Sequence, residues 1–119
     1  FITREHVNKG ILERFESLLN AYFESDLSQV NGIPSVSYFA NELHLSANYF
    51  GVLIKKETGL TAKDYIQNKT IDVAKNRVFD TDKTINEIAF EMGFKYPQHF
   101  TRLFKQRVGQ TPNEYRSLN

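Results

Sequence analysis

Four side chains near the end of the sequence have the chemistry and the spacing needed to contact DNA bases. Gln98, Thr101, Arg102 and Lys105 recur at steps of one to four residues that place them on one face of a helix. In a DNA major groove, glutamine pairs with adenine and arginine pairs with guanine. We therefore expect these residues to contact DNA, although ordinary solvent-exposed side chains would show the same pattern.

A matching stripe lies fifty residues earlier and consists of Asn48, Gly51, Val52 and Lys55. Asparagine can pair with adenine, and an apolar side chain can contact a thymine methyl group. Glycine within a helix costs about 1 kcal/mol relative to alanine, so Gly51 either allows a close approach of the backbone to DNA or is a local weakness. Only Asn48 among the first three can hydrogen-bond to a base, and we expect the later stripe to carry more of the base readout.

Both stripes belong to a repeat of about fifty residues. At a shift of fifty, the coinciding pairs include Phe50 with Phe100, Leu53 with Leu103, Gly59 with Gly109 and Tyr65 with Tyr115. Each unit consists of a short helix, a turn, a longer helix, a glycine stop and a capped helix, which is the plan of a helix-turn-helix. A stacked solenoid would need three or more units, and the sequence holds two.

Hydrophobic periodicity predicts an all-α fold of about seven helices. The expected helices span residues 3–25, 36–43, 47–58, 61–79, 84–92, 97–108 and 112 onward. The expected N-caps and helix stops are Thr3, Ser46, Thr61, Thr84, Thr111, Gly59 and Gly109. Residues 27–35 are interpreted as a loop because Asn-Gly and Pro interrupt them.

The first helix has an apolar face, which predicts that it packs on the first helix-turn-helix unit. This face contains Val7, Ile11, Phe15, Leu18 and Tyr22. If nothing covered it, the stripe would instead favour dimerisation or a helical protein–protein interaction module.

The composition argues against an enzyme. The chain of 119 residues has no cysteine, which excludes disulfides, thiol catalysis and cysteine zinc sites. His6, His44 and His99 do not have a metal-binding spacing, and we expect no catalysis, cofactor or metal. The apolar runs are too short to span a membrane. Residues 1–30 have a net charge of −2 and residues 31–119 a net charge of +3, which is compatible with a nucleic-acid partner.

The segment "FTRLFKQRVGQTPNEYR", with "IAFEMGF" before it, closely resembles the C-terminal signature of AraC/XylS-type transcription regulators. The segment "VSYFANELHLSANYFGVLIKKETGLTAKDYI" is similar to their first helix-turn-helix. This resemblance covers about residues 34–117. The sequence departs from the family pattern at Gly51, Val52 and Pro97, where many relatives carry polar side chains.

The resemblance implies a sequence-specific, cytoplasmic DNA-binding domain that places two recognition helices in successive major-groove segments. It divides the chain into four parts. Residues 1–30 lead toward a separate sensor or dimerisation region, and residues 31–60 form the first helix-turn-helix unit. Residues 61–82 form a linker helix, and residues 83–119 form the second helix-turn-helix unit with the C-terminal helix. The resemblance further implies RNA polymerase as a partner of the full-length protein. We expect the isolated chain to be a monomer, whereas its parent protein dimerises through the separate region.

Overall fold

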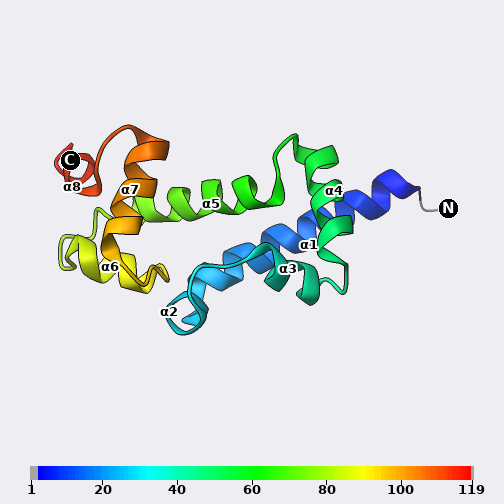
Figure 1. Cartoon of the computed structure of the whole chain (residues 1–119), viewed down its shortest axis with the longest axis horizontal. Coiled ribbons are helices and arrows are strands. Elements are labelled where there is room, and N and C mark those ends of the chain that lie inside the picture. Colours follow the sequence, from blue (N-terminus) through cyan, green and yellow to red (C-terminus); the bar gives the residue numbers. More distant parts are fainter. Residues whose placement is uncertain (1–2, 119) are drawn as a thin grey trace.

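The computed structural model describes residues 3–118, which form eight α-helices and no β-strand (Figure 1). In chain order these are α1 (Arg4–Glu24), α2 (Leu27–Asn31), α3 (Val36–Glu42), α4 (Ala47–Thr58), α5 (Ala62–Arg77), α6 (Ile85–Glu91), α7 (Pro97–Val108) and α8 (Pro112–Arg116). The molecule is elongated, at 52 × 27 × 21 Å, with α1 beginning at one end and α8 at the other. The predicted all-α fold is confirmed. Across residues 3–118, no helix combines the length and the apolar character that a bilayer crossing requires.

Local capping chemistry sets most of the helix boundaries. Each predicted N-cap oxygen accepts a hydrogen bond from the backbone N–H three residues later, which satisfies a donor that the helix itself leaves free. The capping boxes at Thr84 and Thr111 are both complete. Gly59 and Gly109 end α4 and α7 in the left-handed conformation, with φ of 79° and 90°. Thus α4 and α7 have the predicted boundaries.

The prediction of a loop over residues 27–35 is wrong in its first part, because Leu27–Asn31 form helix α2. This helix is too short to have a visible periodicity and is stabilised by tertiary contact. Its Ser28 is buried, and the Ser28 hydroxyl donates to the carbonyl oxygen of Glu91 in α6. The Asn-Gly signal applies only at Gly32, which ends the helix with a positive φ of 88°.

Helix α1 packs against α3, α4 and α5, which confirms the prediction that it covers the first helix-turn-helix unit. Phe15 is fully buried, and its ring contacts the rings of Phe39, Phe50 and Tyr65. The expectation for Val7 is wrong, because its side chain is 46% exposed. Val7 lies in the first turn of α1, and Figure 1 shows that the N-terminal end of α1 extends past α4.

The second helix-turn-helix unit has its own aromatic packing. Phe100 and Phe104 of α7 are fully buried, and the Phe104 ring packs edge-on against Tyr115 of α8. Phe94, in the turn before α7, packs against Phe100. Helix α5 contacts elements of both units, including α4 and α7, and therefore connects them. The buried residues of the two units form one continuous cluster.

Candidate nucleic-acid interface

Helix α4 has one buried face and one free face. Phe50, Leu53 and Ile54 are buried, as their apolar spacing predicts. On the opposite side, Asn48, Val52 and Lys55 are exposed and Gly51 is half-buried. These four residues line one shallow open groove together with Ala47, Thr61 and Ala62. The structure thus brings the first predicted stripe together on the surface.

A Cβ atom added to Gly51 would meet no atom outside its own helix within 4 Å. Packing inside the protein therefore does not require glycine at this position. Val52 beside it is 62% exposed, which is unusual for an apolar side chain in the middle of a helix. The surface between Asn48 and Lys55 is consequently partly apolar.

Helix α7 repeats this arrangement. Pro97 occupies the first helical position, where its missing N–H costs no hydrogen bond. Of the second predicted stripe, Gln98, Arg102 and Lys105 are exposed and Thr101 is half-buried. By helical spacing, Gln98, Arg102 and Lys105 lie opposite Phe100, which is fully buried. The second stripe is therefore also assembled on the surface, and it is more polar than the first.

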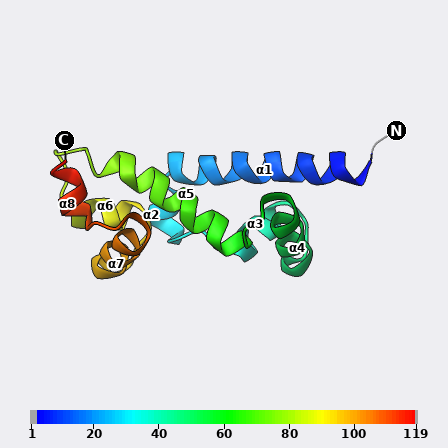
Figure 2. The same cartoon turned by 90° about the horizontal axis from the view of Figure 1, so that it is seen from above.

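The two helices are parallel and lie on the same side of the molecule. In Figure 1 both stand upright at the two ends of α5, and their N-termini point the same way. In Figure 2 both are seen end-on along one edge, with α1 along the opposite edge. This geometry suits successive major-groove segments on one face of DNA, which lie about 34 Å apart. We call α4 and α7 the candidate recognition helices.

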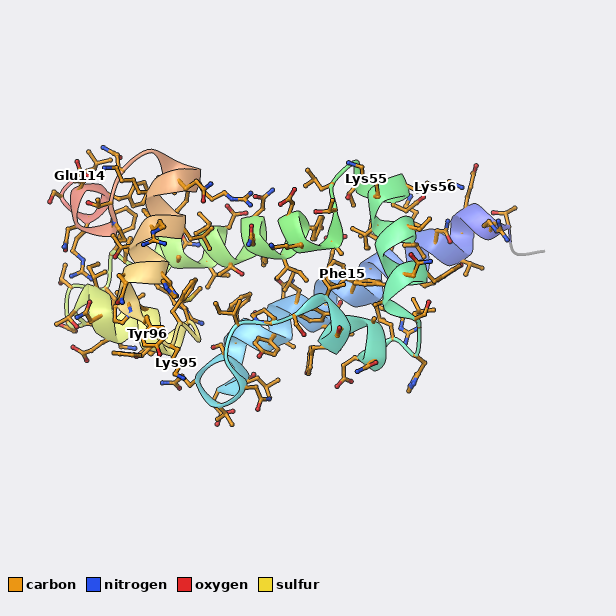
Figure 3. The ribbon with its side chains drawn as sticks, in the orientation of Figure 1. Phe15, Lys55, Lys56, Lys95, Tyr96 and Glu114 are labelled. Carbon is orange, nitrogen blue, oxygen red and sulfur yellow. The ribbon has the colours of Figure 1, made fainter. Side chains whose placement is uncertain are left out.

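The two lysines of the stripes differ in their surroundings. The Lys55 ammonium donates a hydrogen bond of 2.9 Å to the carbonyl oxygen of Gly59 and so caps the end of its own helix. Lys105 occupies the matching place in α7, but its charge lies near Glu114 of α8. Figure 3 shows Lys55 and Lys56 near the C-terminal end of α4, where both extend from the helix.

Sequence reasoning missed side chains beside the N-termini of the candidate recognition helices. Tyr49 and Tyr96 are each almost half exposed, and Lys95 lies 5.6 Å from the centre of the Tyr96 ring. Figure 3 places Lys95 and Tyr96 together at the turn before α7. Tyrosine hydroxyls and lysine ammonium groups commonly contact DNA phosphates. The signal in the sequence was the adjacent pair Lys95–Tyr96, directly before Pro97.

Sequence reasoning also missed the arginine that fixes α7 on the central helix. The Arg107 guanidinium donates to the side-chain oxygens of Asn68, at 2.8 Å, and Gln67, and it forms a 3.4 Å ion pair with Asp64. All three partners lie on α5. A planar guanidinium offers five donors in a fixed arrangement, which allows one side chain to hold several acceptors. The orientation of α7 is therefore tied to that of α5.

A second arginine joins α8 to the end of α5. Arg116 donates to the backbone carbonyls of Val78, at 2.6 Å, and of Lys83, at 2.9 Å. Val78 directly follows α5, where helix carbonyls lack internal partners, and Lys83 directly precedes Thr84, the N-cap of α6. The predicted helical signals gave no indication of this contact, because its partners are more than thirty residues away in sequence.

Comparison with known proteins places this arrangement among helix-turn-helix proteins. Residues 39–117 match the family model described as "Helix-turn-helix domain". The chain is 31% identical over 108 residues to the uncharacterized HTH-type transcriptional regulator YtdP of Bacillus subtilis. The aligned region covers 91% of this chain and 13% of that protein. The chain spans less than half the length of curated relatives such as this one.

Solved structures show the same fold. The C-terminal domain of AraT, a response regulator from Geobacillus stearothermophilus, superposes with a TM-score of 0.78 at 24% identity over 92% of this chain and 85% of that one. The DNA-binding domain of AdpA, a global transcriptional factor solved in complex with a target DNA, gives a TM-score of 0.69 at 19% identity over 87% of this chain and 90% of that one.

Proposed function

This chain belongs to the AraC-type helix-turn-helix family, and we propose that it is the sequence-specific DNA-binding domain of a transcription regulator. In this proposal α4 and α7 enter successive major-groove segments on one face of the double helix. The observation that carries it is the parallel placement, on the same side of the molecule, of two helices that each have a free face (Figures 1 and 2). Two such faces can engage DNA together without any change in the fold.

Within this interface, we assign hydrogen-bonded base readout chiefly to α7. Gln98 and Arg102 can form paired hydrogen bonds with adenine and guanine, and Thr101 can donate or accept. In α4, Asn48 is the one residue of the first three in the stripe with a hydrogen-bonding side chain. We assign Val52 to contact with a thymine methyl group, and Gly51 to a close approach of the backbone to the groove.

Positive side chains supply the sequence-independent part of the affinity. We assign Lys55 and Lys105 to phosphate contacts, because both extend from the free faces toward the C-terminal ends of their helices. Each neutralised phosphate releases a condensed counterion, and binding to duplex DNA weakens by about 0.9 log unit per contact for each tenfold rise in salt.

The alternative, a helical protein-interaction module, loses its main support in this fold. Its best argument was the apolar stripe of α1, and α3, α4 and α5 cover that stripe around Phe15. The comparisons also favour the DNA-binding family. We further propose that the chain acts in the cytoplasm without catalysis, binds DNA as a monomer, and depends on the rest of its parent protein for sensing, dimerisation and contact with RNA polymerase.

We retain the division of this unit into residues 1–30, 31–60, 61–82 and 83–119 as a proposal. Its first part leads toward the remainder of the parent protein, and its third part is the linker between two helix-turn-helix units. Helix α5 contacts both α4 and α7, which supports this role for the linker.

Selection of bound sequences from random duplex DNA tests the proposed function. The expected product is an asymmetric site with two half-sites about 10.5 base pairs apart, one turn of B-DNA. Binding to the selected site should weaken steeply with salt. Recovery of no sequence preference, or a salt-insensitive interaction, would contradict the proposal. A variant with Gln98, Arg102 and Asn48 all changed to alanine is the control: its three substituted side chains are exposed, so it should fold normally and should lose the selected preference.

A further inference from the structure

We propose that α1 and α2 form a brace that fixes the distance and rotation between the candidate recognition helices, with Ser28 and Gly93 as its positioning residues. This inference rests on the proposed DNA-binding function, because it concerns how α4 and α7 are held for two half-sites. The brace connects the two helix-turn-helix units by a second route, beside α5, and it contacts α5 at Tyr65 and Arg77.

One end of the brace is attached to the first unit. The Phe15 ring of α1 lies 4.9 Å from Phe50 of α4 and 5.2 Å from Phe39 of α3, centre to centre. All three side chains are completely buried. Moving α1 relative to α4 would open a cavity between large rings, and such cavities cost several kcal/mol of unfolding free energy in other proteins. Helix α1 therefore moves with α4 as one body.

The other end of the brace touches the second unit through Ser28. This serine is 1% exposed, and its hydroxyl lies 2.7 Å from the carbonyl oxygen of Glu91, 63 residues later in the chain. Glu91 is the last residue of α6, where carbonyl oxygens lack partners within the helix. The serine therefore supplies a donor that the end of α6 requires. The bond joins α2 to the helix that begins the second motif.

Two glycines, Gly32 and Gly93, bring the backbone after α2 against the backbone after α6. A Cβ atom on Gly93 would lie 2.6 Å from the carbonyl carbon of Gly32 and 2.8 Å from its oxygen, which is too close for any side chain. Both glycines have positive φ, and Gly93 lies in the turn between α6 and α7. Backbone thus meets backbone at the turn itself. The Gly32 carbonyl is held in turn by the Tyr22 hydroxyl of α1 at 2.7 Å.

A third contact joins the C-terminal end of α1 to the C-terminal end of α5. The Arg77 guanidinium, in the last turn of α5, donates to the carbonyl oxygen of Phe23 in the last turn of α1. A positive group suits a helix C-terminus, where backbone carbonyls concentrate partial negative charge. The ends of α1 and α5 are therefore joined next to the point where α2 contacts α6. Two struts, α1–α2 and α5, then connect the units instead of one (Figure 1).

A fixed spacing between two half-sites is read only if the two recognition helices keep a fixed distance and rotation, because a flexible connection tolerates several spacings. A linker helix joined to each unit by short turns can still rotate at those turns, and long helices also bend. Arg107 restrains α7 on α5 at one place, and a second attachment at the α6–α7 turn restrains the rotation that remains. The Phe94 ring, directly after Gly93, packs on Phe100 of α7, so the turn and the recognition helix are coupled. Ser28 and Gly93 thereby act on DNA recognition without touching DNA.

The first experiment measures this geometry in the free protein. The chain has no cysteine, so Lys56→Cys and Gln106→Cys introduce two unique, exposed spin-label sites in α4 and α7. Pulsed electron paramagnetic resonance then gives the distribution of distances between the labels. We expect a narrow distribution in the otherwise unchanged chain and a broader one after Gly93→Ala or Ser28→Ala.

Matched controls separate the brace from general destabilisation. Gly109→Ala puts alanine at a φ of 90°, as strained as the 96° of Gly93, but the added Cβ would meet nothing within 4 Å. Ser117→Ala removes a serine hydroxyl that bonds only within its own turn. Both control variants should keep the narrow distribution. A distribution that stays narrow in folded Ser28→Ala and Gly93→Ala proteins would overturn the proposal, and Ser28→Ala decides alone if Gly93→Ala fails to fold.

The second experiment measures the consequence for DNA. Inserting two base pairs between the selected half-sites rotates one by about 70° relative to the other. This insertion should weaken binding of the unchanged chain by about tenfold or more, the value of one good base contact. In the brace variants the penalty should fall well below about tenfold, and both control variants should retain it. Broad distances with an unchanged insertion penalty would overturn the role in DNA spacing. Absence of any DNA binding would instead refute the proposed function, while the spin-label distances still decide whether the brace exists.

Discussion

The ring of Phe15 in α1 meets the ring of Phe50 in α4 edge-on, with centroids 4.9 Å apart and planes at 83°. Both side chains are fully buried. Phe15 lies outside residues 39–117, the part of the chain that matches the helix-turn-helix family model. A candidate recognition helix is therefore supported by a segment that precedes the matched region.

We expect Phe15→Ala to lower the free energy of unfolding by about 3–5 kcal/mol, since it leaves a cavity among three aromatic rings. Urea denaturation followed by circular dichroism measures this change. Val7→Ala in the same helix is the control and should have little effect, because Val7 is almost half exposed. Deleting residues 1–26 should also cost stability, and unchanged melting after that deletion would show that α1 does not support the fold.

Separate alanine substitutions at Gln98 and Arg102 should relax base preference at one position each of the α7 half-site. The reason is that a paired base contact discriminates by about 1–3 kcal/mol. Binding to a panel of single-base variants of the selected site measures the effect. An equal loss of affinity on all sequences would assign the residue to phosphate instead. If Asn48→Ala relaxed the preference while both α7 substitutions left it intact, the expected asymmetry between the helices would be wrong.

Lys105→Ala should weaken binding about equally on all sequences and make the salt dependence shallower by about 0.9 log unit per tenfold salt. Lys9→Ala, on the exposed surface of α1, is the matched control and should leave the slope unchanged. Fluorescence anisotropy over a salt series gives both slopes. Lys55→Ala should in addition lower stability slightly, since it removes the hydrogen bond to the Gly59 carbonyl. A Lys105→Ala slope equal to that of the unchanged chain would exclude the phosphate contact.

The pKa of Glu114 lies below its ordinary value of 4.5, mainly because its carboxylate accepts the backbone N–H of Thr111 in the capping box. A lowered pKa in the folded state contributes stability above the unfolded pKa, and this contribution is lost as pH falls through the folded value. Glu114→Gln keeps a hydrogen-bond acceptor but does not titrate. Melting temperatures at about pH 6 and about pH 3 should therefore differ less in this variant than in a Glu13→Gln control. An identical acid response in both variants would contradict the assignment.

Sedimentation of the isolated chain at micromolar concentration should show a monomer. The apolar face of α1, which would be the obvious surface for self-association, is covered inside the fold. A stable dimer under these conditions would show that another surface associates. If the chain is a monomer, covalently linking two copies should raise their affinity for a tandem DNA site only through effective concentration.

Features with local causes were predictable from the sequence. The boundaries of α4 and α7 follow from Ser46, Pro97 and two glycine stops, which act within a few residues of each helix. The free faces of both helices were also predictable, because an apolar stripe at three- and four-residue spacing identifies the opposite side. These two facts were enough to place all eight candidate DNA-binding residues on or near the surface.

Features with distant causes were not predictable. Helix α2 depends on a bond between Ser28 and Glu91 across 63 residues, and its own five residues have no periodic signal. The contacts of Arg107 join residues about forty positions apart. Val7 follows the apolar spacing of α1, but none of the other described helices covers that end of α1, and its side chain is 46% exposed. Periodicity alone therefore predicted burial wrongly at this position. The missed elements are those that set how the two units are arranged.

The parallel direction of α4 and α7 has a consequence for the genome on which such a protein acts. Two helices that point the same way and differ in their side chains have no twofold symmetry between them. A single bound copy therefore distinguishes one direction along DNA from the other, as an arrow does, and inverting its site turns the whole protein around. Any partner that must meet the bound protein on a particular side would then respond to the orientation of the site as well as to its sequence.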